Sequence, residues 1–532
     1  MFSDRHDASA FRLENEFLAA AVVVAALAIA LPVLAGAGAG AVEGIGSVGA
    51  LGGSPTADAG GADAAGTGIP SNGSGAPGFD VATEVAATTV TAPERGGTAT
   101  VDGESFASAQ AAIDAADPGD TVVLDGRFDE RVNASVDDLR LVASEDGAVI
   151  DGGGEGRVLT VSGEHVTVSG VWIRGSGSDL GTEDAGVFVA GADARIETVR
   201  ITDTAYGIWV DGVDDAVIED VRVDGREDVY PVTDRGNGIH LFETSGTVVR
   251  DSEVANARDG IYFSWSTDVL AEGNTFRQTR YGVHYMYSDD NELVDNVAAD
   301  NGVGYALMVS EGLTVRNNTA LRSDDTSGHG ILARDIEDST IAGNHLVANR
   351  AGLYMHNSQD NRVVDNLLYR NAVGVHSSAD SESEVVAGNS FVRNDRAVRT
   401  PRNSLVEWND THRGNYWSGA RIADRDGDGV SEIRHRPVGL VENLVADSPQ
   451  AAVFANSPAF EAVRLAESSF PVIEAPGVVD RRPLAEPNHD WGAYEPAESA
   501  ETDGKGEPAE TDRDEESTEA DRDPAIDTEA TS

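Results

Sequence analysis

The chain has 532 residues and a formal net charge of −54, from 92 Asp and Glu against 38 Lys and Arg. A surface this acidic excludes nucleic acid as a partner, because phosphate groups would be repelled. Cysteine is absent, so disulfides, thiolate metal sites and cysteine nucleophiles are excluded, and a soft metal would have to be held by His and the 4 Met residues. Dense, well-hydrated carboxylates indicate a halophilic source, and an acidic surface shaped for a cationic partner is the alternative.

Residues 1–42 are predicted to be a signal peptide or a membrane anchor. The run from Phe17 to Val42 is almost wholly apolar and long enough to cross a bilayer. Arginines precede this run, and the next basic residue is Arg95, which places the body of the chain outside. Ala35-Gly36-Ala37 fits a signal peptidase site, although acidic residues before the run also allow an uncleaved anchor. We expect an exported protein at the outer face of the cytoplasmic membrane, in a periplasm-like or extracellular space.

Composition divides the rest of the chain into four parts. Residues 43–98 are rich in Gly, Ala and Ser and are predicted to be a flexible linker. Residues 99–437 hold a sequence repeat, and residues 438–494 hold helical runs that are predicted to cap the repeat or to dock on a partner. Residues 495–532 are dominated by Asp and Glu and are predicted to be a disordered acidic tail.

The repeat has a period of about 22 residues and predicts an all-β solenoid. One column of glycines recurs at Gly238, Gly260, Gly282, Gly304, Gly330, Gly352 and Gly374. One column of asparagines keeps step with it at Asn274, Asn296, Asn318, Asn344, Asn366 and Asn389. Short apolar runs between turn residues cannot pair as hairpins at this spacing, but each can pair in parallel with the matching run one coil later. We predict a single-stranded, right-handed parallel β-helix with the asparagines stacked at one turn.

Side chains alternate between the two faces of a strand, so the residues after each glycine can be assigned to the core or the surface. The first and third positions are mostly large and apolar, and we expect them to point inward. The second and fourth positions would then form one outer face that carries the candidate copper ligands His240, His284, Met286, Met308, His356 and His376.

Imidazole and thioether groups suit copper, above all Cu(I), when thiolates are missing. Contact with a partner or a sugar is an equal alternative, and a face without a role remains open. Two insertions, Arg226 to Arg235 and Arg322 to His329, are predicted to form loops at one edge of this face.

A candidate calcium loop follows the repeat. Asp424, Asp426, Asp428 and Glu432 occupy positions 1, 3, 5 and 9 of a calcium-loop pattern. Position 12 is His435, so the bidentate carboxylate is missing. An acidic turn without an ion is the alternative.

Glycan cleavage is the second function that the residues suggest. Asp324, Asp325 and Gly328-His329-Gly330 contain pieces of the polygalacturonase active site. In those enzymes the carboxylates lie about one coil away from the Gly-His-Gly, and an Arg-x-Lys completes the site. This chain has neither feature, so a polysaccharide-binding or polysaccharide-cleaving β-helix is kept as the alternative, with Asp325 and His329 as the residues to test.

Several segments together resemble the NosD family, the β-helical maturation proteins of nitrous oxide reductase. The resemblance spans about residues 100 to 485 and is carried by Gly238-Ile-His-Leu-Phe, Gly260-Ile-Tyr-Phe-Ser-Trp, Arg280-Tyr-Gly-Val-His-Tyr-Met-Tyr-Ser and Gly414-Asn-Tyr-Trp-Ser. His284 and Met286 lie in the matching motif, whereas His240 and Met308 join them only through the outer-face argument. The long linker and the acidic tail depart from the usual form of the family.

The resemblance implies an exported accessory protein that is not an enzyme. It would work in denitrification with the membrane subunit of an ABC transporter, a copper chaperone and nitrous oxide reductase. Its implied role is to help assemble the copper-sulfur centre of that enzyme by binding or handing over copper, or sulfur.

Overall fold

The computed structural model describes residues 95–495 except 324–326, 379, 382, 401–404 and 470–475. The predicted leader, nearly all of the linker and the acidic tail lie outside this part of the chain. Among the described residues, none of the helices has the length and apolar character needed to cross a membrane.

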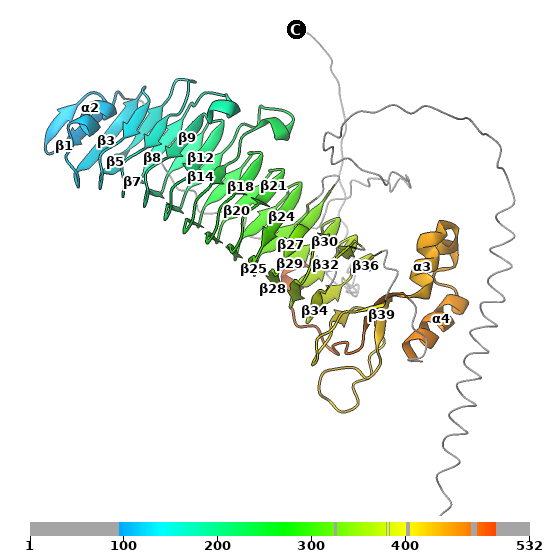
Figure 1. Ribbon diagram of the computed structural model, residues 1–532. Coiled ribbons are helices and arrows are strands. Elements are labelled where there is room, and N and C mark those ends of the chain that lie inside the picture. The colour runs from blue at the N-terminus through cyan, green and yellow to red at the C-terminus, as the bar shows by residue number, and fades with distance from the viewer. Residues whose placement is uncertain are drawn as a thin grey trace, which may run out of the picture.

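The predicted solenoid is confirmed as a long parallel β-helix (Figure 1), with a short helix at its N-terminal end and two helices beyond its last coil. Each coil has three strands, and each strand pairs in parallel with its equivalent in the next coil. The coil containing Leu293, for example, matches the next one at Leu293↔Val315, Ala298↔Ala320 and His284↔Ala306.

One face of the solenoid is a twelve-stranded sheet. Its strands are β4 (Val132–Ala134), β6 (Leu159–Val161), β9 (Ala185–Val189), β12 (Tyr206–Asp211), β15 (Ile239–Phe242), β18 (Asp259–Ser264), β21 (Tyr281–Met286), β24 (Val303–Glu311), β27 (His329–Glu337), β30 (Ala351–His356), β33 (Val373–Ser377) and β36 (Arg396–Arg399).

The other two faces belong to one larger sheet. The first of these faces comprises β3 (Thr121–Phe128), β5 (Arg140–Asp151), β7 (Thr167–Ser169), β10 (Arg195–Glu197), β13 (Val217–Glu219), β16 (Val248–Arg250), β19 (Leu270–Glu272), β22 (Glu292–Val294), β25 (Thr314–Arg316), β28 (Thr340–Ala342), β31 (Arg362–Val364) and β34 (Val385–Ala387). The second comprises the end of β5, β8 (Val171–Arg174), β11 (Arg200–Thr202), β14 (Arg222–Asp224), β17 (Glu253–Ala255), β20 (Thr275–Arg277), β23 (Val297–Ala299), β26 (Thr319–Leu321), β29 (His345–Val347), β32 (Leu367–Tyr369), β35 (Ser390–Val392) and β38 (Tyr416–Trp417).

The remaining elements lie at the ends and in the loops. They are β1 (Thr98–Val101), β2 (Glu104–Phe106), α2 (Ala109–Asp114), η1 (Leu180–Thr182), η2 (Val232–Asp234), β37 (Leu405–Glu407), β39 (His435–Val438), α3 (Leu440–Asp447), η3 (Pro449–Phe454), α4 (Pro458–Ser469), β40 (Gly477–Asp480) and η4 (Gly492–Tyr494). Helix α2 begins at Ser108, whose hydroxyl accepts a hydrogen bond from the Ala111 amide, and it covers the first coil with Ala109, Ala112 and Ile113.

The asparagine column forms the predicted ladder. Each side-chain amide donates a hydrogen bond to the Oδ1 atom of the asparagine one coil later. Nδ2 of Asn296, for example, donates to Oδ1 of Asn318 at 2.9 Å. The same Oδ1 atoms accept the backbone N–H of the preceding asparagine, so each buried turn is satisfied by the next coil. The ladder ends at Asn415, in the Gly414-Asn-Tyr-Trp motif. There the buried carboxylate of Asp480 accepts a hydrogen bond of 2.7 Å from the backbone N–H of Asn415.

The glycine column is explained by space. A Cβ atom at Gly260 would lie 2.3 Å from the carbonyl oxygen of Gly282 and 2.4 Å from the ring of Phe276. A backbone carbonyl cannot move aside without breaking the hydrogen bonds between neighbouring strands. Only glycine therefore fits where each coil turns into the twelve-stranded sheet.

Candidate metal centre on the outer face

All six predicted copper ligands belong to the outer side of the twelve-stranded sheet, which we call the histidine face. Their inward neighbours, such as Leu241 and Tyr285, are fully buried in the core. Along the second position of each strand, the register aligns Trp209, His240, Tyr262, His284, Ala306, Leu332, Tyr354 and His376. Along the fourth position, it aligns Phe242, Ser264, Met286, Met308, Arg334 and His356.

The face holds two separate groups of candidate residues. His240, His284, Met286 and Met308 lie on β15, β21 and β24, whereas His356 lies two strands beyond β24, on β30, and His376 lies three strands beyond it, on β33. Leu332 and Arg334 on β27 stand between the groups. Neighbouring strands are about 4.8 Å apart, so the two groups cannot share one ion.

His284 is held by a buried ionic network. Its Nδ1 atom lies 3.1 Å from Oδ2 of Asp259, which is completely buried, and Arg280 donates to both oxygens of the same carboxylate at 2.9 and 2.6 Å. A carboxylate only accepts, so Nδ1 carries the proton and Nε2 keeps its lone pair. This Nε2 atom is buried and has no hydrogen-bond partner.

The charge of Asp259 survives its burial. Burial alone would raise the pKa of this carboxyl, but the hydrogen bonds from His284 and Arg280 outweigh it and lower the pKa to about 2. Burial also lowers the pKa of His284, and Asp259 opposes that shift only in part. The imidazole is therefore neutral and orientated by a carboxylate, which is how metal-binding histidines are commonly prepared.

Two thioethers complete one corner of the face. Met286 follows His284 on the same side of β21, and Met308 pairs with Met286 in register on β24. Ala306 pairs with His284 in the same register, so the next strand places a small side chain beside the imidazole. Met308 is 8% exposed and packs with Ala306 and Met286 in an apolar cluster. We call His284, Met286 and Met308 the copper corner.

His240 differs from His284 in its hydrogen bonding. Its Nδ1 atom lies 3.2 Å from Nδ2 of Asn237, whose Oδ1 accepts from Arg258 at 3.1 Å. The amide therefore donates to Nδ1, so the proton of His240 lies on Nε2. The ring packs between Trp209, which is tilted by 40° with its centroid 3.8 Å away, and the edge-on ring of Tyr262 at 4.8 Å. Burial lowers the pKa of His240 to about 3. We interpret His240 as a packed neutral residue beside the copper corner.

The downstream group gathers around Tyr354. The rings of His329 and His376 each lie 4.8 Å from Tyr354, and His356 lies 6.3 Å from it. Burial lowers the pKa of His329 and of His376 to about 4. In the described part of the chain, no three His or carboxylate groups on this face bring their ligand atoms within 4.8 Å.

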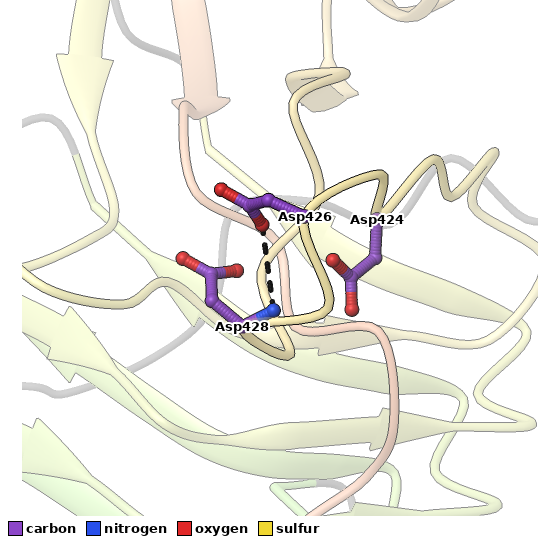
Figure 2. A group of neighbouring side chains, drawn as sticks. All are labelled: Asp424, Asp426 and Asp428. Carbon is purple, nitrogen blue, oxygen red and sulfur yellow. Dashed lines mark hydrogen bonds between the residues drawn. The ribbon is translucent and has the colours of Figure 1, made fainter.

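The candidate calcium loop lies far from both groups. Figure 2 shows Asp424, Asp426 and Asp428 around one turn, with ligand oxygens within 4.8 Å of one another. The oxygens of Asp424 already accept hydrogen bonds from the backbone N–H groups of Gly427 and Gly429. The carboxylate of Glu432 accepts a hydrogen bond from the backbone N–H of Arg425. The loop stays a predicted calcium site of Asp424, Asp426, Asp428 and Glu432, of which the first three bring their oxygens together.

The residues proposed for glycan cleavage are only partly described. Asp324 and Asp325 lie outside the described residues. The ring of His329 is stacked on that of Tyr354 with an interplanar angle of 8°.

Sequence reasoning missed the residues that prepare the copper corner. Asp259 precedes the column glycine of its coil, and Arg280 lies in the same turn one coil later. Charged residues directly beside the regularly spaced glycines were a signal, but the pairing of Asp259 with Arg280 and His284 appears only when the coils are stacked.

The fold and the outer face define a class: a parallel β-helix that presents imidazole and thioether groups on one outer sheet. Residues 220–421 match the family model described as "Periplasmic copper-binding protein (NosD)". Two relatives named "Probable ABC transporter binding protein NosD" are similar along most of their length. The one from Pseudomonas aeruginosa is 38% identical over 64% of this chain and 82% of its own, and the one from Stutzerimonas stutzeri is 39% identical over 64% and 81%.

The chain therefore belongs to the NosD family, and the expectation of an accessory protein that is not an enzyme is confirmed. Two solved structures show a weak similarity to this chain at low sequence identity. The periplasmic alginate epimerase AlgG is 13% identical with a TM-score of 0.37 over 59% of this chain and 94% of its own. The AlgE6 A-module of Azotobacter vinelandii is 18% identical with a TM-score of 0.39 over 55% and 92%. This similarity concerns the fold alone.

Proposed function

We propose that this chain is an exported accessory protein that binds Cu(I) at the copper corner and hands it over for assembly of the copper-sulfur centre of nitrous oxide reductase. The observation that carries the proposal is the buried, unpartnered Nε2 atom of His284 on the same outer corner as two methionines. The names of the family model and of the relatives, which mention copper and an ABC transporter, support this reading.

The chemistry of the corner favours Cu(I). Cu(I) is a soft ion that accepts thioether and imidazole ligands in low coordination numbers. A neutral imidazole with a free lone pair and two uncharged sulfur atoms can hold this ion without a buried ligand charge. Harder ions such as Mg²⁺ and Ca²⁺ prefer oxygen, which the corner does not present.

Delivery requires that a partner can reach the corner. Trp265 and Tyr287 occupy the turns next to Ser264 and Met286 and are 57% and 45% exposed. Their rings stack with centroids 4.5 Å apart, and they form an exposed aromatic pair at the edge of the corner. Exposed aromatic residues of this kind are typical of contact sites for partner proteins. We propose that nitrous oxide reductase or a copper chaperone docks on this pair.

The C-terminal unit offers a second contact. Val453 and Phe454 on η3 and Leu465 on α4 are 85%, 44% and 45% exposed. Helices α3 and α4 lie beyond the last coil, at the opposite end from α2 (Figure 1). We propose that this end docks on the membrane subunit of the ABC transporter and that the chain is retained at the outer face of the membrane by residues 17–42.

The proposal is tested by anaerobic titration of the full chain with Cu(I) against a chromogenic chelator. We expect stoichiometric binding by the wild type and its loss in H284A/M286L/M308L, with an unchanged circular dichroism spectrum. The matched controls are M355L, which changes a methionine buried in the core, and H412A, which changes an exposed histidine. Equal Cu(I) affinity in the triple variant and the wild type would remove the copper corner as the site. Delivery of sulfur in place of copper would be indicated if the wild type binds no Cu(I) yet supports assembly.

A further inference from the structure

The three edges of the solenoid differ in charge. Each edge has a turn position with φ between about +48° and +59°, where Asn, Asp and Gly are favoured. On the edge that follows the twelve-stranded sheet, this position holds Asp193, Asp215, Asp268, Asp290, Asp338 and Asp360. On the edge between the other two faces, it holds Asp220, Asp251, Asp295 and Asp365.

The third edge leads back into the twelve-stranded sheet, and in its C-terminal half the same position holds arginine at three turns and Ala348 at a fourth. Arg322, Arg370 and Arg393 have φ values of +52°, +54° and +53°. A long side chain in this left-handed conformation costs roughly 1 kcal/mol. Three arginines at equivalent turns of an acidic chain therefore point to a use for positive charge here.

Further arginines border the same turns. Arg350 lies in one of them, Arg396 begins β36 directly after another, and Arg399 aligns with His376 on the outer face. Arg350, Arg393, Arg396 and Arg399 are exposed. We call Arg322, Arg350, Arg370, Arg393, Arg396 and Arg399 the arginine edge. Asp300 and Asp395 are the acidic side chains in the described turns of this stretch, and Asp300 is bound by Arg322.

The last described segment of the chain leads directly to the arginine edge. At Asn488 it contacts Gly388 on the edge between the other two faces, through a hydrogen bond of 2.9 Å. It then crosses the sheet, where Trp491 packs against Tyr369 and Tyr494 joins the same apolar cluster. At its end, the Glu495 carboxylate accepts a hydrogen bond from Arg393.

We propose that the acidic tail, residues 496–532, docks in cis along the arginine edge. The tail has fourteen acidic and three basic residues and starts where Glu495 already pairs with Arg393. A flexible chain of this length spans about 34 Å, whereas the edge from Arg393 to Arg322 covers three coils, or about 14 Å. Tethering gives the tail an effective concentration of the order of millimolar at this edge, so weak ion pairs suffice to hold it.

The docked tail would cover the edge next to the Tyr354 group and leave the copper corner, further along the solenoid, accessible. The contact consists of exposed ion pairs, so salt weakens it. An acidic partner would have to displace the tail, which makes the tail a competitor for that surface. This inference is independent of the proposed copper function.

Arginine footprinting of the full chain tests the proposal. The wild type is compared with a full-length variant in which every Asp and Glu of residues 496–532 is replaced by Asn or Gln. Both are treated with an arginine-specific dicarbonyl reagent in one buffer in which circular dichroism shows an intact fold. We expect Arg370, Arg393 and Arg396 to react several times more slowly in the wild type. The control residues Arg316 and Arg362, which are exposed on another face, should react equally in both chains.

A second measurement does not depend on reagent access. Because the chain has no cysteine, S517C provides a unique site for a fluorophore on the tail. We expect its anisotropy to fall in R370E/R396E and to stay unchanged in R316E/R362E. Equal footprints in the wild type and the neutralised tail, or equal anisotropy in both charge-reversal variants, would overturn the proposal.

Discussion

Asp259 decides how the imidazole of His284 is presented. The carboxylate fixes the proton on Nδ1, and Arg280 keeps the carboxylate charged within the protein. Without Asp259 the ring could rotate or exchange tautomers, and Nε2 would no longer be fixed as the nitrogen that keeps the lone pair. A residue with no copper contact is thus expected to control copper affinity.

We predict that D259N weakens Cu(I) binding by about 10- to 100-fold, the usual effect of removing a carboxylate that orientates a metal-binding histidine. Competition titration gives the affinity, and ¹⁵N NMR of His284 reports the tautomer. D338N, at an exposed turn, is the control. Unchanged affinity together with a changed tautomer would show that Asp259 has only a structural role.

Buried neutral histidines make stability depend on pH. The folded-state pKa is about 3 for His240 and about 4 for His329 and His376, against 6.5 for the unfolded chain. Between pH 6.5 and about 4 the unfolded chain binds more protons than the folded one, so stability falls as the pH is lowered through this window. Thermal denaturation at pH 7 and pH 5 should show the loss, and H329Q/H376Q should show a smaller one. An equal loss in both proteins would contradict this assignment.

The asparagine ladder is the element that holds the coils in register. Asn318 donates to the Leu293 carbonyl at 2.8 Å and to Asn344, and it accepts the Asn296 amide. N318A would leave buried partners unsatisfied on two neighbouring coils. We predict a loss of about 2–4 kcal/mol in the free energy of unfolding, measured by denaturant titration. Q359A, at an exposed turn, should cost less than about 0.5 kcal/mol. A similar cost for both would mean that the ladder does not stabilise the coils.

Elements with a strict period could be predicted from the sequence, and contacts between coils could not. The glycine and asparagine columns set the coil length, and alternation then assigned Tyr285 to the core and His284 to the outer face. A second ladder through Asn349, Asn371 and Asn394 was missed, because it occupies only part of the solenoid. Asp259 and the arginine edge were also missed, since their meaning depends on side chains one coil away.

At the scale of the whole molecule, we propose that the solenoid separates copper binding from copper delivery. The copper corner is fixed by rigid stacked strands, while the exposed aromatic pair Trp265 and Tyr287 lies on turns beside it. We predict that W265A/Y287A slows copper transfer to apo nitrous oxide reductase and leaves Cu(I) affinity unchanged. The control is Y230A, an exposed aromatic residue on another loop. Normal transfer by the double variant would place the docking surface elsewhere.

The central claim is that one imidazole and two thioethers hold copper on the outer face. Copper K-edge X-ray absorption of the full chain loaded with one equivalent of Cu(I) tests this directly. We predict one nitrogen and two sulfur ligands in the wild type, and loss of the sulfur shell in M286L/M308L but not in M355L. A first shell of nitrogen and oxygen alone in the wild type would contradict the account.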